Sequence, residues 1–264
     1  MPGREVTWSG SMPETYDVRL GPAMFQPAAV ALAHRVEDSG ASDVLELAAG
    51  TGIVTAAIAS ALPAATVVAT DLSPAMVDYA SRQVPAAQWR QADAMDLPFE
   101  DTAFDLVVCQ FGVMFLPDKV QGFREAARVL RPGGRYVFAT WDAVEENDFV
   151  VALTDVLQEI GADHAVTFLR RIPYGYADPA ELRRDVEAGG LIVEAIDVVP
   201  LEGASTAVDV ATGFLQGTPT TAFLGDVGDL ATVTDRVATG IAARLGESFT
   251  TRPQAVFTTA RCPD

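Results

Sequence analysis

Two acidic residues and one turn of small residues are the first features of this sequence with the types and spacing to do chemistry. Glu46 lies inside an apolar run, VLELAAGTG (44–52), that closes on Gly50 and Gly52. Glycine at a strand-to-helix turn permits a positive φ and lets a ligand approach the backbone, and the N–H groups that start the next helix can receive a carboxylate. An ordinary tight turn would also use these glycines, so the run indicates a ligand site only together with other signals.

The second acidic residue, Asp71, ends the next apolar run, TVVATD (66–71), nineteen positions after Gly52. This is close to the spacing at which an acidic side chain accepts the hydroxyls of a bound ribose. Helix capping is the alternative role for Asp71, but Ser73 is better placed to cap the following helix. The sequence therefore predicts a nucleoside cofactor.

The glycine pattern narrows the choice of nucleoside. A nicotinamide dinucleotide normally needs G-x-G-x-x-G, but the third position is Thr55 when counted from Gly50 and Ile53 when counted from Ala48. The pyrophosphate site is thus incomplete. Glu46 suits the cationic headgroup of an amino acid instead, which favours S-adenosylmethionine (SAM).

The elements that must position these residues follow an alternating pattern, which predicts a parallel sheet with helices on both faces. Strands are expected at 43–48, 66–71, 87–91, 104–110, 134–141, 191–199 and 254–261. Helices are expected at 53–62, after the cap Ser73, at 119–130, at 148–160 and at 179–188 after the cap Asp178, and the stretch 203–250 carries further helical pattern.

Composition excludes several classes of function. The chain has 264 residues, is 49% hydrophobic and carries a net charge of −18, which disfavours nucleic acid and anionic membranes as partners. No apolar run approaches the length of a membrane span, and the start lacks the apolar region of a secretory signal, so we expect a cytoplasmic protein. Cys109 and Cys262 are the only cysteines and form no disulfide framework, and no spacing of Cys and His indicates a metal site.

Four motifs between Val44 and Trp141 resemble those of the class I SAM-dependent methyltransferases, in the group similar to the ubiquinone and menaquinone C-methyltransferases. The matching stretches are VLELAAGTG (44–52), DLSPAMVDYA (71–80), QADAMDLPFEDTAFDLVVCQFGVMFLPD (91–118) and RVLRPGGRYVFATW (128–141). Ala48 departs from the family pattern, which has its first glycine there, and this puts only the shape of the loop in question.

The resemblance implies a Rossmann-like, doubly wound α/β fold with seven strands in the order 3-2-1-4-5-7-6, the last one antiparallel. It implies one methyltransferase domain over 1–264, with the SAM-binding core at about 43–142, an N-terminal cap at 1–42 and a C-terminal part at 143–264. The substrate would be a small-molecule methyl acceptor, methylated on O, C or N by in-line transfer, and the product would be S-adenosylhomocysteine (SAH). A homodimer is left open.

The resemblance also implies roles for the matching residues. Glu46 would anchor the methionine amino group, and the backbone from Ala48 and Ala49 to Gly50 and Gly52 would line the methionine portion. Asp71 would bind the ribose, and Leu72 would pack on the adenine. Asp93 would accept the adenine amino group, the Ala94 N–H would meet a ring nitrogen, and Gln110 and Phe111 would lie beside the methyl group. Met114 and Phe115 are expected to be core residues.

Catalytic residues are expected to be few, because a sulfonium methyl is already electrophilic and proximity supplies much of the rate enhancement. The ionisable candidates for a base are Tyr16, Asp142, Glu145 and His164, of which Tyr16 and His164 are kept as weak catalytic candidates. A single histidine in a loop-to-helix segment, such as His164, is more often structural or on the surface, and His34 is expected on a helix surface. No residue stands out as the base.

Two added segments are expected to recognise the acceptor, because the first five strands are committed to the cofactor. The N-terminal stretch 8–29, which holds Trp8, Tyr16, Met24 and Phe25, looks too irregular for a plain helix. The insertion at about 205–248 carries Phe214, Leu215, Phe223 and Leu224 beside glycines, which suits a lid. Simple coverage of the sheet is the alternative for both segments.

Two other functions remain open on the same fold. A non-catalytic SAM-binding regulatory protein would bind SAM without turnover, since a fold does not establish a function. A nucleic-acid methyltransferase is disfavoured by the net charge and by CQFG (109–112), where amino-methylating DNA enzymes resemble a (D/N/S)-P-P-(Y/F) pattern.

Overall fold

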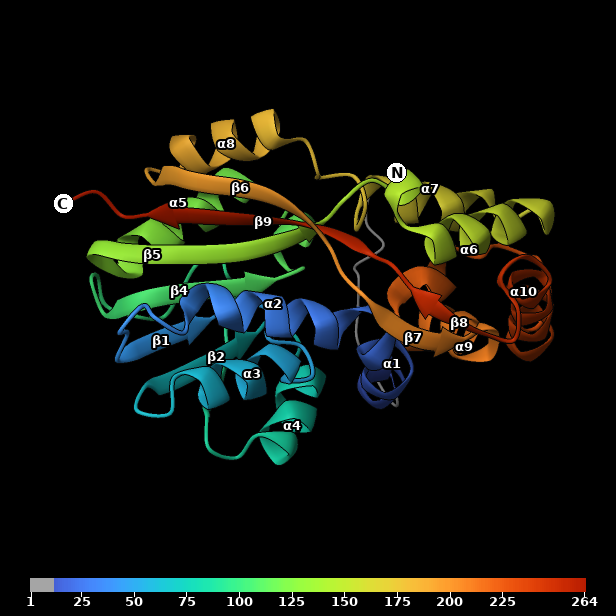
Figure 1. Cartoon of the computed structure of the whole chain (residues 1–264), viewed down its shortest axis with the longest axis horizontal. Coiled ribbons are helices and arrows are strands. Elements are labelled where there is room, and N and C mark those ends of the chain that lie inside the picture. Colours follow the sequence, from blue (N-terminus) through green and yellow to red (C-terminus); the bar gives the residue numbers. More distant parts are fainter. Residues whose placement is uncertain (1–11) are drawn as a thin grey trace.

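A seven-stranded sheet forms the centre of the protein, whose computed structural model describes residues 12–264 (Figure 1). The strand order is β3-β2-β1-β4-β5-β9-β6, and β9 runs antiparallel to β5 and β6. The predicted order and the antiparallel last strand are thus confirmed. The strands are β1 (Asp43–Glu46), β2 (Thr66–Asp71), β3 (Gln88–Gln91), β4 (Phe104–Gln110), β5 (Leu130–Trp141), β6 (Ile192–Pro200) and β9 (Gln254–Arg261).

Helices cover both faces of this sheet, as the alternating pattern predicts. α2 (Gln26–Val36) packs with α3 (Ile53–Ala61) on one face, and α5 (Lys119–Val129) packs with α8 (Pro179–Ala188) on the other (Figure 1). α4 (Pro74–Gln83) follows β2. Its predicted cap is confirmed, because the Ser73 hydroxyl accepts from the Met76 N–H. The cap at the start of α8 is confirmed as well, because Asp178 accepts from the Ala180 N–H.

The fifth strand begins earlier than its sequence pattern predicts. β5 starts at Leu130, which pairs with Phe104, and the register then shifts so that Arg135 pairs with Leu106. The Arg-Pro-Gly-Gly stretch (131–134), which follows the helix predicted at 119–130, therefore lies in an irregularity of the strand itself. A bulge of this kind disrupts the pairing locally without ending the strand.

The N-terminal segment is helical, and our expectation that it is too irregular for a plain helix is only partly correct. α1 (Met12–Leu20) runs through one π-helical stretch, η1 (Gly21–Phe25), directly into α2. Pro22 and Pro27 each lie in the first turn of their element, at the two joints where the hydrogen-bonding pattern of this continuous helical run changes. Trp8, a residue named for this segment, lies outside the described residues.

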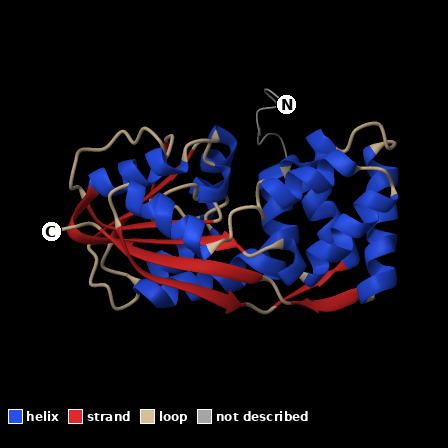
Figure 2. Cartoon of the chain, turned by 90° about the horizontal axis from the view of Figure 1, so that it is seen from above, coloured by secondary structure: helices blue, strands red, loops and turns tan. Residues whose placement is uncertain are grey.

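A helical lobe projects from one end of the sheet (Figures 1 and 2). β6 is followed by β7 (Gly203–Thr206), and β8 (Ser248–Thr251) leads back into β9, so the lobe is carried on two interrupted strands. Pro200 and Pro253 stand at the interruption, where the Leu201 N–H still bonds to the Pro253 carbonyl at 2.8 Å. The sequence pattern did not indicate the β7–β8 pair.

The lobe gathers helices from distant parts of the chain. α6 (Asp148–Glu159) and α7 (Asp163–Arg171) follow β5 after a short 3₁₀ turn, η3 (Val144–Glu146), whereas α9 (Ala207–Gly217), η4 (Pro219–Phe223) and α10 (Leu230–Leu245) lie between β7 and β8. α1 packs against α9, which joins the N-terminus to the insertion. Within residues 12–264, no helix has the length and apolar character to cross a membrane.

Candidate functional site

The turn after β1 adopts the backbone conformation that its glycines predict. Ala48, Gly50 and Gly52 all have positive φ, at 51°, 56° and 90°. Two glycines meet this requirement without strain, but Ala48 has a Cβ in the left-handed region. Gly112 makes room for that Cβ, because a Cβ added at Gly112 would lie 2.4 Å from the Ala48 Cβ. The departure from the family pattern at Ala48 is thus accommodated by a glycine sixty-four positions later.

Glu46 is a buried carboxyl group at the end of β1. Its side chain is 1% exposed and accepts a hydrogen bond from the Thr55 hydroxyl at 2.6 Å. Burial raises the pKa of Glu46 to about 8, the Thr55 hydrogen bond opposes this rise, and the nearby Asp71 adds to it. A cationic ligand beside this buried carboxyl group would stabilise its ionised form.

Glu46 lines a small cavity of about 40 Å³ at the carboxyl end of the sheet. The other lining residues are Tyr16, Phe25, Ala48, Ala49, Gly50, Thr51, Ile53, Val54 and Gln110. The Gln110 amide donates to the Phe25 carbonyl at 3.2 Å. Its Oε1 is buried and has no hydrogen-bond partner among the described residues. Two polar acceptors, Glu46 and Gln110, therefore belong to one cavity, which we call the polar cavity.

Asp71 holds the neighbouring turns together at the end of β2. Its two carboxylate oxygens accept from the backbone N–H groups of Gly50 and Ser73, each at 2.8 Å. Burial raises the pKa of Asp71, and these two N–H groups oppose the rise. A carboxylate offers about four acceptor sites, so capacity for further donors remains. Next to it, the side chain of Leu72 is exposed, with a relative exposure of 64% for the residue.

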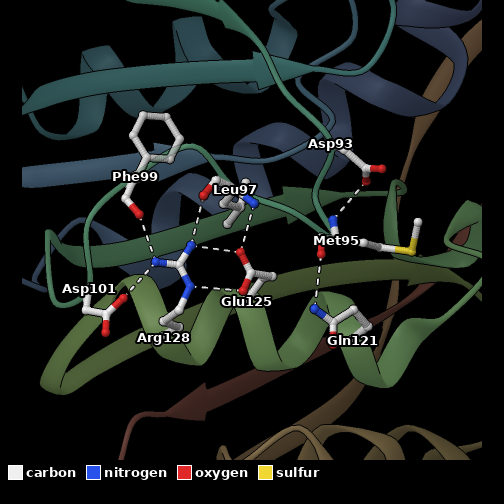
Figure 3. Close-up of polar contacts among 8 residues, drawn as sticks. All are labelled: Asp93, Met95, Leu97, Phe99, Asp101, Gln121, Glu125 and Arg128. Atoms are coloured by element: carbon white, nitrogen blue, oxygen red, sulfur yellow. Dashed lines mark hydrogen bonds and ion pairs between the residues drawn. The ribbon is translucent and has the colours of Figure 1, made fainter.

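The loop after β3 carries Asp93 and Ala94, both half-buried. The Asp93 carboxylate accepts from the Met95 N–H at 2.8 Å, and the Asp96 N–H bonds to the Asp93 carbonyl at 3.1 Å. Figure 3 shows that this loop runs alongside α5, whose side chains contact its backbone. The loop is thus a defined structure that starts at the end of β3.

A second, apolar cavity of about 60 Å³ adjoins the first, and Tyr16 and Phe25 line both. The other residues around it are Leu20, Met24, Phe111, Met114, Phe115, Trp141, Phe168, Leu169, Pro173, Tyr174, Phe214, Thr218, Pro219 and Thr220. Half of all its lining residues are aromatic, and none carries a charged side chain. We call this space the aromatic cavity.

Stacked rings organise the aromatic cavity. Phe111 stacks on Trp141 with ring centroids 3.5 Å apart, and Trp141 in turn stacks on Tyr174 at 6.2 Å. Tyr16 stacks on Phe25 at 4.3 Å. Such rings form a rigid wall with polarisable faces. Phe111 has a positive φ of 59°, so the chain bends sharply directly after β4 to place its ring there.

Hydroxyl groups and the indole N–H of Trp141 are the polar hydrogen-bonding side-chain groups of the residues that line the aromatic cavity. Thr218 donates to the Phe214 carbonyl at 2.7 Å and pairs with Thr220 at 2.8 Å. The Tyr174 hydroxyl is buried and has no hydrogen-bond partner within residues 12–264. Burial, followed by Asp71, Tyr174 and Asp17, raises the pKa of Tyr16 well above its usual value, and burial raises the pKa of Tyr174 too. Both phenols therefore stay protonated near neutral pH.

The ionisable candidates from the sequence are scattered. His164 is exposed at the start of α7, and Glu145 is exposed and pairs with Arg170. Asp142 accepts from the Ala143 N–H at 2.8 Å. None of these three lines either cavity, whereas Tyr16 lines both. His34, exposed beside Glu37, lies on a helix surface as predicted.

Several lining residues were not found by sequence reasoning. Phe168 and Tyr174 line the aromatic cavity although they lie in none of the four motifs, and Trp141 lines it although it was given no role as the last residue of its motif. Met114 is buried, as expected, but it also lines the cavity, and the core assignment of Phe115 is wrong because that ring is 37% exposed. In residues 12–264, no group of three His, Cys, Asp or Glu side chains is placed to hold a metal ion.

Comparison with known proteins identifies the family. Residues 45–138 match the family described as "Methyltransferase domain". The demethylmenaquinone methyltransferase of Deinococcus radiodurans is 32% identical over 176 residues, which cover 62% of this chain and 71% of that protein.

The fold of this chain is also similar to the folds of solved structures. Phosphoethanolamine N-methyltransferase 2 of Haemonchus contortus, solved with SAM, is 17% identical with a TM-score of 0.60, covering 96% of this chain and 57% of that one. The [4+2]-cyclase SpnF is 18% identical with a TM-score of 0.57, covering 90% of this chain and 80% of that one. Together with the four motifs and the strand order, the match in sequence shows that this chain belongs to the class I SAM-dependent methyltransferases, in the group that resembles the menaquinone and ubiquinone methyltransferases.

Proposed function

We propose that this chain transfers a methyl group from SAM to a small, uncharged, ring-containing acceptor that binds in the aromatic cavity. The observation that carries the proposal is the adjacency of two chemically different cavities. One is bordered by the turn after β1 and by Glu46, the other by aromatic rings, and Tyr16 and Phe25 line both. A methyl donor and a methyl acceptor need such neighbouring sites, since transfer requires contact.

The residues around the polar cavity fit SAM. The Gln110 Oε1 is a buried acceptor that has no partner in the described part of the chain, and Glu46 is a second acceptor, which together suit an ammonium group. A Cβ added at Gly50 would meet nothing within 4 Å, so the turn leaves room for a ligand against its backbone. The exposed Leu72 offers an apolar surface for a purine ring.

In this proposal Glu46 and Gln110 bind the methionine ammonium, Asp71 the ribose, and Asp93 with the Ala94 N–H the adenine edge. When bound, SAM supplies an electrophilic sulfonium methyl group for in-line displacement by O, N or C of the acceptor. Phe111, Trp141 and Tyr16 exclude water from the place of transfer.

The lining of the aromatic cavity defines the acceptor class. A charged acceptor would lose its hydration there without gaining a counter-ion, which is strongly unfavourable. A flat ring can stack on Phe111 or Trp141, and a hydroxyl or carbonyl oxygen on it can pair with the buried Tyr174 hydroxyl. Because the two tyrosines stay protonated, they act as hydrogen-bond donors and not as bases. The one proton that a neutral acceptor loses for the methyl group it gains passes to solvent.

Ligand stabilisation tests the cofactor assignment. SAM and SAH should raise the melting temperature, whereas NAD and NADP should not, because only a ligand of the native state stabilises it. Equal stabilisation by NAD would refute the assignment. Methyl transfer from labelled SAM to a panel of neutral phenols, enols and aromatic amines, with phosphorylated and carboxylated counterparts as matched controls, then tests the acceptor class. Preferred turnover of the charged counterparts would contradict it.

A tyrosine variant tests the recognition of the acceptor. Tyr174→Phe removes the unpartnered hydroxyl and keeps the ring, so acceptor kcat/KM should fall about tenfold for oxygen-bearing acceptors while the SAH dissociation constant stays unchanged. SAM binding without turnover of any acceptor would instead favour the regulatory alternative. The cyclase with the same fold illustrates that the fold alone does not require methyl transfer.

A further inference from the structure

The loop after β3 is held along its length by one face of α5. Gln121, Glu125 and Arg128 are spaced four and three residues apart on α5 and therefore share a face. Figure 3 shows all three pointing at the loop, which carries the proposed adenine-binding residue Asp93 at its start. The family resemblance implies no role for any of these three side chains.

Arg128 donates hydrogen bonds to two backbone carbonyls of the loop. Its guanidinium donates to the Leu97 carbonyl at 2.9 Å and to the Phe99 carbonyl at 2.8 Å, and it pairs with Asp101 at 2.8 Å. The planar fork of arginine can reach all these acceptors together, which a lysine cannot do.

Glu125, on the same helix, binds both the loop and Arg128. One of its carboxylate oxygens accepts the Leu97 N–H at 2.8 Å, and both oxygens accept from Arg128. The side chain is largely buried, and the hydrogen bond from Arg128 keeps the pKa of Glu125 below its usual value. The pair stays ionised, and its contacts with the loop are made through Leu97 and Phe99 backbone atoms and Asp101.

Gln121 connects α5 to the part of the loop that carries Asp93. Its amide donates to the Met95 carbonyl at 3.1 Å, and the N–H of the same Met95 donates to the Asp93 carboxylate at 2.8 Å. The carboxylate of Asp93 is therefore connected to α5 through a single residue. A backbone held at residues 95, 97 and 99 has little freedom to rotate at residue 93.

We propose that Gln121, Glu125 and Arg128 are positioning residues that hold the loop after β3 so that Asp93 and Ala94 meet the adenine edge of SAM. The inference rests on the proposed function, because it assigns the adenine subsite to Asp93 and Ala94. The inference goes beyond the proposed function because it attributes part of the selectivity for adenine to side chains of α5 that do not touch the ligand.

The test compares two ligands that differ along the edge of the base that Asp93 and Ala94 would meet, since hypoxanthine has a carbonyl oxygen and an N1–H where adenine has an amino group and an N1 acceptor. S-inosylhomocysteine carries an oxygen where SAH carries the amino group, so wild type should prefer SAH. Gln121→Met removes the amide donor at similar length, and we expect it to weaken SAH about five- to tenfold and to leave S-inosylhomocysteine almost unchanged. In turnover, KM for SAM should rise while kcat is retained, which a mere loss of folded protein would not produce.

A second variant distinguishes a loss of positioning from a loss of folded protein. Arg128→Lys keeps the charge beside Glu125 but loses the fork, so it should reduce the preference for SAH in the same way with little loss of stability. Arg183→Lys changes an exposed arginine paired with Glu187 on α8 and serves as the matched control, with wild-type selectivity expected.

The outcomes separate this inference from the proposed function. Reduced SAH preference in both α5 variants, with the control unaffected, supports the positioning role. Wild-type selectivity in folded Gln121→Met and Arg128→Lys would overturn the positioning role and leave the proposed function intact. No SAH binding by wild type, or no preference of wild type for SAH over S-inosylhomocysteine, would overturn the adenine assignment and this inference with it.

Discussion

The two cavities are built by opposite means. The polar cavity takes most of its lining from one short stretch, residues 46–54, in which backbone groups and three small residues of positive φ set the shape. The aromatic cavity takes side chains from α1, η1, η2 (Val113–Phe115), the end of β5, α7, α9 and η4. A chain built in this way can keep a local, backbone-built cofactor site while its acceptor site changes with each added segment.

The two cavities also differ in charge. Glu46 is a buried carboxyl group in the polar cavity, with Asp71 nearby, whereas the residues lining the aromatic cavity bring no charged side chain. The pH dependence of stability should therefore arise mainly on the cofactor side, and its largest contribution should come from Glu46.

Glu46→Gln should change the dependence of stability on pH. The pKa of Glu46 is about 8 in the folded protein against 4.5 for an unperturbed glutamic acid, so the folded state keeps a proton that the unfolded chain loses. Stability should fall as pH rises from about 4.5 to about 8, by at most roughly 5 kcal/mol at 1.36 kcal/mol per pKa unit. The glutamine keeps an acceptor for Thr55 without the charge and should flatten this fall.

Urea unfolding at pH 5, 7 and 9 without ligand measures the effect. The variant should be more stable than wild type at pH 9 and close to it at pH 5. Glu247→Gln, at an exposed position, is the charge-matched control. Parallel curves for wild type and Glu46→Gln would contradict the buried carboxyl group on which the comparison depends.

Asp71→Asn should weaken cofactor binding and spare the acceptor site. The amide can still accept one N–H bond, but it loses the charge that a ribose hydroxyl would meet, and we expect the SAH dissociation constant to rise about ten- to a hundredfold. Calorimetric titration gives the constant, with Asp78→Asn on the exposed side of α4 as the control. An unchanged constant would remove Asp71 from the site.

Phe214→Leu should affect binding in the aromatic cavity and leave the polar cavity unchanged. Phe214 is 4% exposed, lines the aromatic cavity and packs near Phe149. Leucine keeps an apolar side chain but loses the ring face, so acceptor kcat/KM should fall about tenfold while SAH affinity is kept. Phe249→Leu removes a ring from β8 outside the cavity and is the matched control. Equal losses of SAH affinity and turnover would show that the two sites are not separable.

Glycine substitutions in the turn after β1 should give the smallest effect. Ala48 has a φ of 51°, so Ala48→Gly relieves backbone strain of about 1 kcal/mol and offsets the greater freedom of glycine in the unfolded chain. Ala49→Gly, at a neighbour without positive φ, has no strain to relieve and should destabilise by about 1 kcal/mol. Thermal unfolding of the two variants gives the difference, and equal effects would argue against strain at Ala48.

Sequence patterns predicted most of the core because its elements are set by local chemistry. β2, β4 and β9 have the expected bounds, and the caps Ser73 and Asp178 fall where their side chains can accept an N–H. The strand order followed from the resemblance in motifs. The β7–β8 pair was missed since GAST (203–206) has no apolar alternation, and its partner strand, 248–251, lies far away in the chain.

The proposed cofactor site could be located from the sequence, since Glu46, Gly50 and Asp71 lie within 26 residues, where strand ends and turn glycines specify position through short-range geometry. Of the aromatic cavity, the sequence named Tyr16, Met24, Phe25 and Phe214, but the rest of the lining depended on tertiary structure. Folding placed Trp141 between Phe111 and Tyr174, left the Tyr174 hydroxyl buried without a partner in the described residues, and set Gln121 against the loop of Asp93. A ring in a sequence carries no sign of whether it fills the core or lines a cavity, because both are apolar burial and differ only in which distant side chains pack beside it.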